Sequence, residues 1–213
     1  MLTKTGSTAD VIAASLRDMI NQGELPDGAR LIERELASQF AVSRIPLREA
    51  IQQLEREGIV ETQRNRGAAV RALTVDDVNE IYTLRALLEG EAIYHSVIHR
   101  DEETLARVRL VHQLLESTVS VQKQGELNRE FHTLLYRGCH NGRLLKMIAE
   151  LCAQIERYEY LQRRLLADTP AFQHEHAAIL DAYARGDAQQ AREETIRHIE
   201  SARQVVLTRI SLQ

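Results

Sequence analysis

The sequence predicts a mainly α-helical chain with a small N-terminal part, residues 1–72, and a larger all-helical part, residues 73–213. Apolar residues recur at intervals of three and four along most of the chain, which is the spacing of one helical face. The pattern is interrupted around residues 59–71, where two short extended stretches flank a glycine-containing turn. After Thr74 no alternation of apolar and polar residues occurs, so we expect no strand there.

Residues 42–58, VSRIPLREAIQQLEREG, are predicted to form a helix with one buried and one exposed face. The apolar face is made by Leu47, Ala50, Ile51 and Leu54. Ser43 is a good N-cap, and Pro46 in the first turn costs little because the first N–H groups of a helix have no internal partner. Arg44 and Arg48 lie four residues apart on the exposed face. Their guanidinium groups can bind guanine or a phosphate, and a solvated charged face is the alternative.

The neighbouring segments make this helix part of a winged helix-turn-helix. A short helix at about residues 32–39 precedes it by only a few residues, which is helix-turn-helix spacing. After it, stretches 59–63 and 68–71 flank the basic turn Arg64-Asn65-Arg66-Gly67, whose glycine permits a tight hairpin. A first helix at residues 9–21 is expected to pack behind the DNA-reading helix.

Composition excludes some classes of protein. With 213 residues, of which 44% are apolar, the chain can bury a core. No run of about 18 apolar residues occurs and the N-terminus lacks a signal-peptide apolar region, so we expect no membrane segment and a cytoplasmic location. Cys139 and Cys152 have no CxxC spacing and are expected to be reduced core residues. Glycine-rich phosphate loops, GxSxG elbows and kinase signatures are absent from the sequence.

Charge is distributed unevenly along the chain. The net charge of −4 does not by itself indicate nucleic-acid binding. Residues 42–71, however, contain six arginines against four glutamates. Because so small a basic region offers few phosphate contacts, we expect a homodimer that binds a pseudo-palindromic double-stranded DNA operator.

Six amphipathic helices are predicted after the short linker Arg71-Ala72-Leu73. Thr74 and Asp77 can form a capping box for the first of them, which runs to about Ile98. The breaks between the others are expected at Asp101, before Gly125, at Asn141-Gly142, at Asp168-Thr169-Pro170 and at Arg185-Gly186-Asp187. The expected architecture is therefore an N-terminal winged helix-turn-helix followed by an all-α six-helix bundle.

Three histidines are predicted to converge inside the bundle. Asn128 and His132 lie four residues apart on one face of a helix. His176 and His198 lie at similar distances on either side of Gly186, so on two antiparallel helices they would sit at nearly the same height. Three imidazoles can hold a metal, but a histidine on an apolar face is more often a core residue, and both interpretations are open at this point. Five further histidines are expected not to be ligands: His95, His99, His112, His140 and His174.

The segment from Gly28 to Val70, GARLIERELASQFAVSRIPLREAIQQLEREGIVETQRNRGAAV, resembles the winged helix-turn-helix of GntR-superfamily transcription regulators over its whole length. The resemblance implies DNA contacts by Arg34, Ser43, Arg44 and Arg48 and by the wing residues Arg66 and Gly67. The wing glycine would lie against the minor groove. Many members carry threonine where this chain has Ile45, so one hydroxyl contact would be missing.

The stretches LNREFHTLLY and EHAAILDAYARGDAQQA, with the later His198, resemble the C-terminal ligand-sensing FCD domain of the FadR branch of that superfamily. Many members bind a divalent metal through an acidic residue and three histidines. These positions match Asn128, His132, His176 and His198, with Asn128 in place of the more usual aspartate. The resemblance implies a divalent metal, with zinc first. Because the neutral amide of Asn128 is a weaker ligand than a carboxylate, nickel and manganese stay as alternatives.

A small carboxylate effector is also implied by the resemblance, bound at the open positions of the metal. Arg85 resembles a position from which an arginine could meet a second charge on the effector. A salt bridge from Arg85 to Glu89, four residues later, is the alternative.

The sequence therefore predicts a metabolite-responsive DNA-binding transcription regulator, a repressor, whose operator affinity is controlled by an organic acid at a metal site. One alternative is a metal-dependent hydrolase on a helical bundle. Arg44 and Arg48 argue against it, because an enzyme has no use for arginines on an exposed DNA-reading face. The other is a helical DNA-binding scaffold without sensing, for which Asn128 is the one indication.

Overall fold

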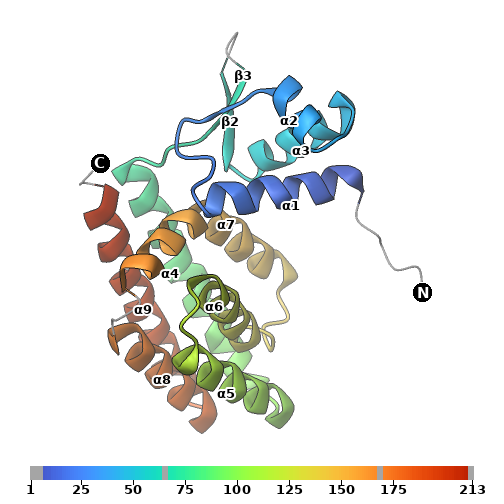
Figure 1. The fold of residues 1–213 in the computed structure, drawn as a ribbon. Helices are drawn as coiled ribbons and strands as arrows, with labels where there is room; N and C mark the ends of the chain where they lie inside the picture. Colours follow the sequence, from blue (N-terminus) through green and yellow to red (C-terminus); the bar gives the residue numbers. More distant parts are fainter. Residues whose placement is uncertain (1–6, 64–66, 167–169, 211–213) are drawn as a thin grey trace. The chain divides into compact units, whose positions relative to one another are not determined.

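The computed structural model describes residues 7–63, 67–166 and 170–210. The chain divides into two compact units, Met1–Leu73 and Thr74–Gln213 (Figure 1). Two predicted turns fall partly outside the described residues: Arg64, Asn65 and Arg66 of the wing, and Asp168 and Thr169 between two helices of the bundle.

The N-terminal unit is a winged helix-turn-helix, as predicted. Its elements are α1 (Thr8–Asn21), β1 (Arg30–Leu31), α2 (Glu33–Gln39), α3 (Arg44–Arg56), β2 (Val60–Gln63) and β3 (Gly67–Val70). The strands form an antiparallel sheet in the order β1-β3-β2, with Arg30 opposite Ala69 and Val60 opposite Val70. Both α1 and α2 pack against α3, and β2 and β3 form the wing hairpin (Figure 1).

Local sequence explains where the helices of this unit begin and end. Ser7 and Asp10 form a reciprocal capping box at the start of α1. The buried face of α3 consists of the four predicted residues, Leu47, Ala50, Ile51 and Leu54. After α3, Gly58 has a φ of +74°, a left-handed conformation that glycine adopts without strain. Ala41, in the turn between α2 and α3, has a φ of +52°, which is uncommon for a residue with a Cβ atom.

The strand β1 was not predicted from the sequence, which indicated only the two strands of the wing. Arg30 and Leu31 pair with Ala69 and Ala68 on the free edge of β3. Two residues are too few to show an alternation of apolar and polar side chains. The pairing with a distant strand decides this conformation.

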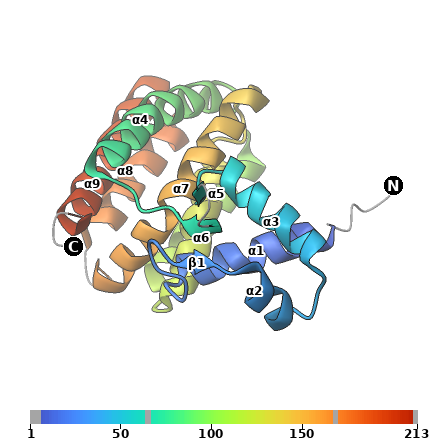
Figure 2. The same cartoon turned by 90° about the horizontal axis from the view of Figure 1, so that it is seen from above.

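Over its described residues, the C-terminal unit is a six-helix bundle, as predicted. Its helices are α4 (Val75–Ile98), α5 (Glu102–Ser117), α6 (Val121–Leu135), α7 (Gly142–Leu166), α8 (Pro170–Arg185) and α9 (Ala188–Ile210). The most extensive packing is between α4 and α9, followed by α8 against α9. These three helices run side by side in Figures 1 and 2.

Caps place the first helices of the bundle. The Thr74 and Asp77 capping box is confirmed, and Asp101 caps α5 by accepting from the Thr104 N–H. The expected start of α6 after Gly125 was wrong, because α6 begins at Val121 and encloses this glycine. The Ser120 side chain caps α6, and Gly125 is buried, so capping and close packing offset the low helix propensity of glycine.

The core of the bundle lies between all six helices. Its largest fully buried apolar side chains include Ile93, Phe131, Leu135, Ile179 and Tyr183. Over residues 7–63, 67–166 and 170–210, no helix combines the length and the apolarity that crossing a membrane would require. The three histidines that the sequence placed on facing helices were expected to point into the interior of the bundle.

Candidate DNA interface and metal centre

The predicted DNA-reading residues lie on the surface of α2 and α3. Arg34 on α2 and Arg44 and Arg48 on α3 are all exposed. Within the described residues, Arg34 and Arg44 make no ion pair. Their guanidinium groups are therefore available to an incoming polyanion.

Arg48 differs from the other two because it already has a partner. Its Nε donates to Glu33 Oε1 at 3.1 Å and its Nη2 to Glu33 Oε2 at 2.8 Å. This bidentate pair lowers the pKa of the Glu33 carboxyl, chiefly through the hydrogen bond from Arg48. The two side chains are 60% and 36% exposed, so solvent screens the pair and binding of DNA can break it at little cost.

Three further residues complete the start of α3 and the wing. Ser43 stands at the N-cap position but its side chain makes no capping hydrogen bond, which leaves its hydroxyl for another acceptor or donor. Ile45 is 71% exposed, so a large apolar side chain projects from the first turn of α3. Gly67 opens β3 with a φ of +78° and is exposed. The predicted contact residue Arg66 lies outside the described residues.

The three predicted histidines converge inside the bundle. His132 comes from α6, His176 from α8 and His198 from α9, and each offers a ring nitrogen within 4.8 Å of the others. Their ring centroids lie 5.3 Å (His132 to His176), 5.3 Å (His132 to His198) and 4.6 Å (His176 to His198) apart. His176 and His198 are buried and His132 is half-buried. Among the described residues this is the single group of three potential metal ligands.

A hydrogen bond to Glu175 fixes which nitrogen of His198 carries the hydrogen. His198 Nδ1 lies 2.8 Å from Glu175 Oε2, so Nδ1 donates its hydrogen and the lone pair remains on Nε2. That Nε2 faces His176 Nε2 at 3.3 Å. Burial, with a contribution from the neighbouring imidazoles, lowers the pKa of His176 well below its usual value, so this ring is neutral at pH 7.

These residues fit a divalent metal. The lone pair of His198 Nε2 lies 3.3 Å from His176 Nε2, so either the hydrogen of the His176 ring or a cation can occupy the space between them. The buried Nδ1 of His176 has no hydrogen-bond partner in the described structure, which leaves either nitrogen of this ring open to bind. Neutral imidazoles are the common ligands of zinc and of other transition metals. A carboxylate behind a histidine, as Glu175 lies behind His198, is the usual outer partner of a metal-bound imidazole.

The remaining predicted residues of this site, Asn128 and Arg85, lie on α6 and α4. Asn128 is half-buried, one turn of α6 before His132. Arg85 on α4 is buried, and its Nε donates to Glu89 Oε1 at 2.7 Å, which is the salt bridge that the sequence left as an alternative. Its Nη1 also donates to Glu159 Oε1 on α7 at 2.7 Å. Two carboxylates therefore already face Arg85, so a negatively charged effector would have to displace one of them.

Sequence reasoning missed the residues that support the histidines. Glu175 follows His174 in the chain and precedes His176, a position that gave no sign of a contact with His198. Tyr136 lies one turn after His132, and its hydroxyl is 3.3 Å from His132 Nδ1 and 2.7 Å from Glu89 Oε2. Burial and the facing carboxylate raise the pKa of Tyr136 well above its usual value. The spacing of four residues between His132 and Tyr136 was the one available signal.

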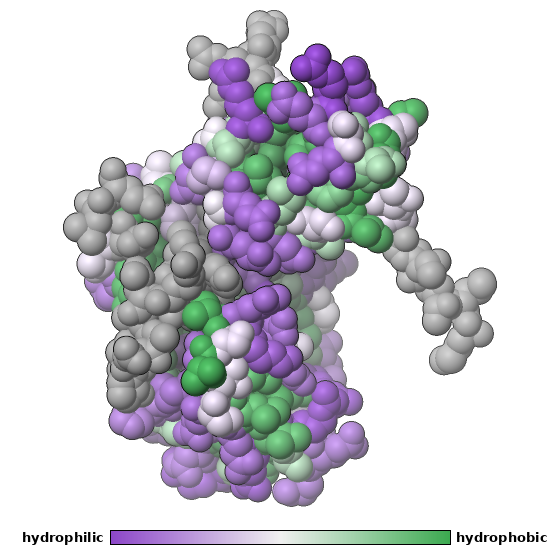
Figure 3. Space-filling model, in the orientation of Figure 1, coloured by the Kyte–Doolittle hydropathy of each residue, from purple (hydrophilic) through white to green (hydrophobic). Residues whose placement is uncertain are grey.

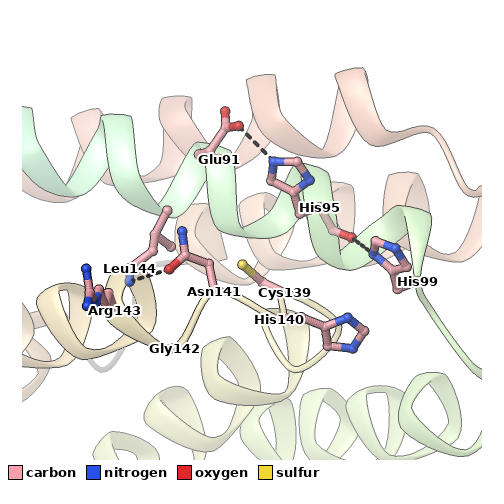
Figure 4. Close-up of a pocket in the computed structure, with 9 residues that line it drawn as sticks. All are labelled: Glu91, His95, His99, Cys139, His140, Asn141, Gly142, Arg143 and Leu144. Carbon is pink, nitrogen blue, oxygen red and sulfur yellow. Dashed lines mark hydrogen bonds and ion pairs between the residues drawn. The ribbon is translucent and has the colours of Figure 1, made fainter.

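A second group of histidines lines a surface groove of about 750 Å³ between α4 and the start of α7 (Figure 4). His95 pairs with Glu91 at 2.9 Å, and the His99 ring bonds the His95 carbonyl oxygen at 2.9 Å. His99 and His140 have ring centroids 5.0 Å apart. Each of these side chains has a local partner or is exposed, and within the described residues they do not join in a three-ligand group.

Two family models match the chain. The model described as bacterial regulatory proteins, gntR family, matches residues 8–70, and the model of the FCD domain matches residues 80–201. The chain belongs to the GntR family of bacterial transcription regulators and carries an FCD domain. This GntR regulator therefore has a DNA-binding winged helix in the same residues that present Arg34, Arg44 and Arg48.

Known proteins similar to this GntR regulator are regulators rather than enzymes. An HTH-type transcriptional regulator of Paraburkholderia xenovorans (strain LB400), BphR, is 34% identical over 204 residues, which cover 90% of this chain and 82% of that protein. The gluconate operon transcriptional repressor of Bacillus licheniformis is 27% identical over 161 residues, covering 74% and 66%. A solved GntR-family regulator of Pseudomonas syringae pv. tomato str. DC3000 is 33% identical, covers 96% of this chain and 86% of that chain, and has a TM-score of 0.60. The hydrolase alternative has no support among these relatives.

Proposed function

We propose that this GntR regulator is a metal-dependent sensor of a small organic acid that controls its affinity for operator DNA. The observation that carries the proposal is the convergence of His132, His176 and His198 from three different helices. A divalent metal, zinc in the first place and nickel or manganese as alternatives, would be held by these three imidazoles with help from Asn128. A bound metal ion supplies a Lewis-acid centre with open positions for a carboxylate group.

The acid would act by binding one arrangement of the bundle better than another. An effector shifts an equilibrium only by its difference in affinity for the two states, and a difference of about 1–3 kcal/mol changes operator occupancy several-fold to a hundredfold. His132, His176 and His198 lie on α6, α8 and α9, so a ligand that draws them together changes how these helices pack. Because α9 packs on α4, which begins directly after the N-terminal unit, that change would reach the segment that joins the two units.

On the DNA side, Arg34, Ser43, Arg44 and Arg48 with the wing residues Arg66 and Gly67 are proposed to contact the operator.

One winged helix offers few phosphate contacts, so we propose a homodimer on a pseudo-palindromic site. The exposed large apolar residues of the bundle include Leu84 and Leu87 on α4 and Leu110 and Leu114 on α5. Figure 3 shows apolar atoms on the visible surface of the bundle. Such residues suit a pairing surface within the bundle. The sign of regulation is proposed as repression, as in the Bacillus licheniformis relative.

The test uses operator duplexes selected from a randomised library by the purified protein. We expect the zinc-loaded wild-type protein to change its operator affinity at least several-fold with one member of a panel of small mono-, di- and hydroxy-carboxylic acids. The His176→Ala variant should bind the same duplex but give no response to the acid. His174→Ala is the matched control, because His174 is exposed and lies two residues away on the same helix.

An acid response that survives in His176→Ala would show that the acid binds elsewhere. A wild-type protein that selects a duplex, holds metal and responds to no acid in the panel would favour the DNA-binding scaffold without sensing. A protein that selects no duplex would contradict the assignment of the DNA-reading residues.

A further inference from the structure

We propose that Tyr136 and Glu89 are positioning residues of the histidine site, which hold the His132 ring with its hydrogen on Nδ1 and so present Nε2 to the metal. This inference rests on the metal site of the proposed function. It concerns two residues to which neither the sequence nor the family resemblance assigned a role at the histidine site. The three residues form a chain of contacts from α6 to α4.

Two of the three residues, Tyr136 and Glu89, are buried in the protein interior. Tyr136 is 4% exposed and Glu89 is 1% exposed, so water reaches neither group to any extent. The Tyr136 hydroxyl oxygen lies 2.7 Å from Glu89 Oε2, a short hydrogen bond, and 3.3 Å from His132 Nδ1, a longer one. A buried polar group that lacks its partner destabilises the protein, so each of these contacts constrains the others.

The direction of each hydrogen bond follows from the chemistry of Glu89. Its Oε1 accepts from Arg85 Nε at 2.7 Å, and a carboxylate that faces a guanidinium is an acceptor at both oxygens. Tyr136 must therefore donate its single hydroxyl hydrogen to Glu89 Oε2. The Tyr136 oxygen can then only accept, which requires the hydrogen of His132 to be on Nδ1. The lone pair of His132 is left on Nε2.

Donation of the Tyr136 hydroxyl hydrogen to His132 instead of Glu89 would be less favourable. If Tyr136 donated to His132 Nδ1, Glu89 Oε2 would lose its hydrogen-bond donor within the protein interior. The two distances agree with donation to Glu89, because that contact is shorter, at 2.7 Å against 3.3 Å. His198 also carries its hydrogen on Nδ1, and it donates this hydrogen directly to Glu175. In both cases a carboxylate fixes the ring and leaves Nε2 for the metal.

Glu89 is itself held in place. Arg85 binds it on α4, and Arg85 is tied to Glu159 on α7 at 2.7 Å. The position of the His132 ring thus depends on α4 and α7 as well as on α6. Arg85 therefore helps to position the His132 ring through Glu89, without contacting a ligand itself.

The experiment compares Tyr136→Phe with the wild-type full chain. Phenylalanine keeps the ring and removes only the hydroxyl that joins His132 to Glu89. We expect the dissociation constant for zinc, measured by competition with a chromophoric chelator, to rise about 10- to 100-fold. Tyr183→Phe is the matched control, because Tyr183 is another fully buried tyrosine of the same bundle, on α8. Its zinc affinity should remain within twofold of the wild-type value.

A second measurement is made without metal, so it does not depend on whether a variant binds zinc. Nitrogen-15 NMR of the imidazole rings in the metal-free protein reports which nitrogen carries the hydrogen. We expect His132 to carry it on Nδ1 in the wild-type protein and to lose that preference in Tyr136→Phe, while His198 keeps its Nδ1 hydrogen in both. Equal zinc affinity for wild type and Tyr136→Phe, or a wild-type His132 protonated on Nε2, would overturn the inference and leave the proposed function standing. A wild-type protein that binds no zinc would overturn both.

Discussion

The DNA-reading face of α3 and the histidine site of the bundle are built in opposite ways. Arg44, Ser43 and Ile45 are exposed, and their side chains have few partners to hold them. His176 and His198 are buried, and the ring of His198 is fixed by Glu175. A surface that must fit a large, mobile polyanion can use unpaired side chains, because DNA supplies the partners. A site that must select one small ion or molecule needs its geometry set in advance.

This difference predicts where substitutions affect folding and where they affect binding alone. Removing a side chain from the DNA-reading face should leave stability unchanged. Removing one from the network behind the histidines should cost stability as well as binding. The four variants below test that contrast.

Glu89→Ala should have the largest effect, on stability. It leaves the buried Arg85 guanidinium with one of its two carboxylates and removes the acceptor of Tyr136. We expect the free energy of unfolding to fall by about 3 kcal/mol, measured by urea denaturation. Asp181→Ala breaks the exposed ion pair with Arg185 and should change stability by less than about 0.5 kcal/mol. Equal effects of the two variants would mean that burial of the network contributes nothing.

Arg44→Ala should weaken operator binding by about 1–3 kcal/mol at a fixed salt concentration and leave the unfolding curve unchanged. The reason is that Arg44 is exposed at the start of α3 and has no competing ion pair within the described residues. Arg56→Ala is the control, since Arg56 lies in the last turn of the same helix. A loss of affinity in Arg56→Ala as large as in Arg44→Ala would show that only total charge matters.

Ile45 should read a thymine methyl group. It is 71% exposed next to Arg44, and apolar side chains contact that methyl in the major groove. Replacing one operator thymine by uracil removes the methyl and should weaken wild-type binding by about 0.8 kcal/mol. The same duplex should bind Ile45→Ala no more weakly than the thymine duplex does. If uracil at every thymine position leaves wild-type binding unchanged, Ile45 does not contact a methyl group.

Glu33→Gln should have the smallest effect, on the salt dependence of binding. Without the Glu33 carboxylate, Arg48 is free to contact a phosphate in any duplex. The slope of log affinity against log salt should steepen by about 1 on non-operator DNA. Glu35→Gln, an exposed residue of the same helix, should leave that slope as it is. An unchanged slope in Glu33→Gln would show that Arg48 reaches phosphates in spite of its pair.

Short-range features of the fold could be predicted from the sequence. The buried face of α3 and the caps at Thr74 and Asp101 depend on residues three or four apart. The convergence of His176 and His198 followed from their distances to Gly186. Each of these predictions needs only the geometry of one helix or of one helix pair.

Contacts between distant residues could not be predicted. Arg48 and Glu33 are 15 residues apart, and Tyr136 and Glu89 are 47 residues apart. A charged group or a hydroxyl has many possible partners in the sequence. The packing of the helices decides which of them it contacts. The same holds for β1, whose two residues are extended because β3 offers them a free edge. The sequence therefore located the histidines but not the network that supports them.

The most direct test of the central claim is the metal content of protein purified without chelator and without a metal-binding affinity tag. Elemental analysis would be made on the protein as purified and after loading with zinc and removal of excess ion. We predict about one zinc per chain in the wild-type protein after loading, and at most a small fraction of that in His176→Ala. If neither wild-type sample holds near-stoichiometric metal, then His132, His176 and His198 are core residues, and other groups bind the effector.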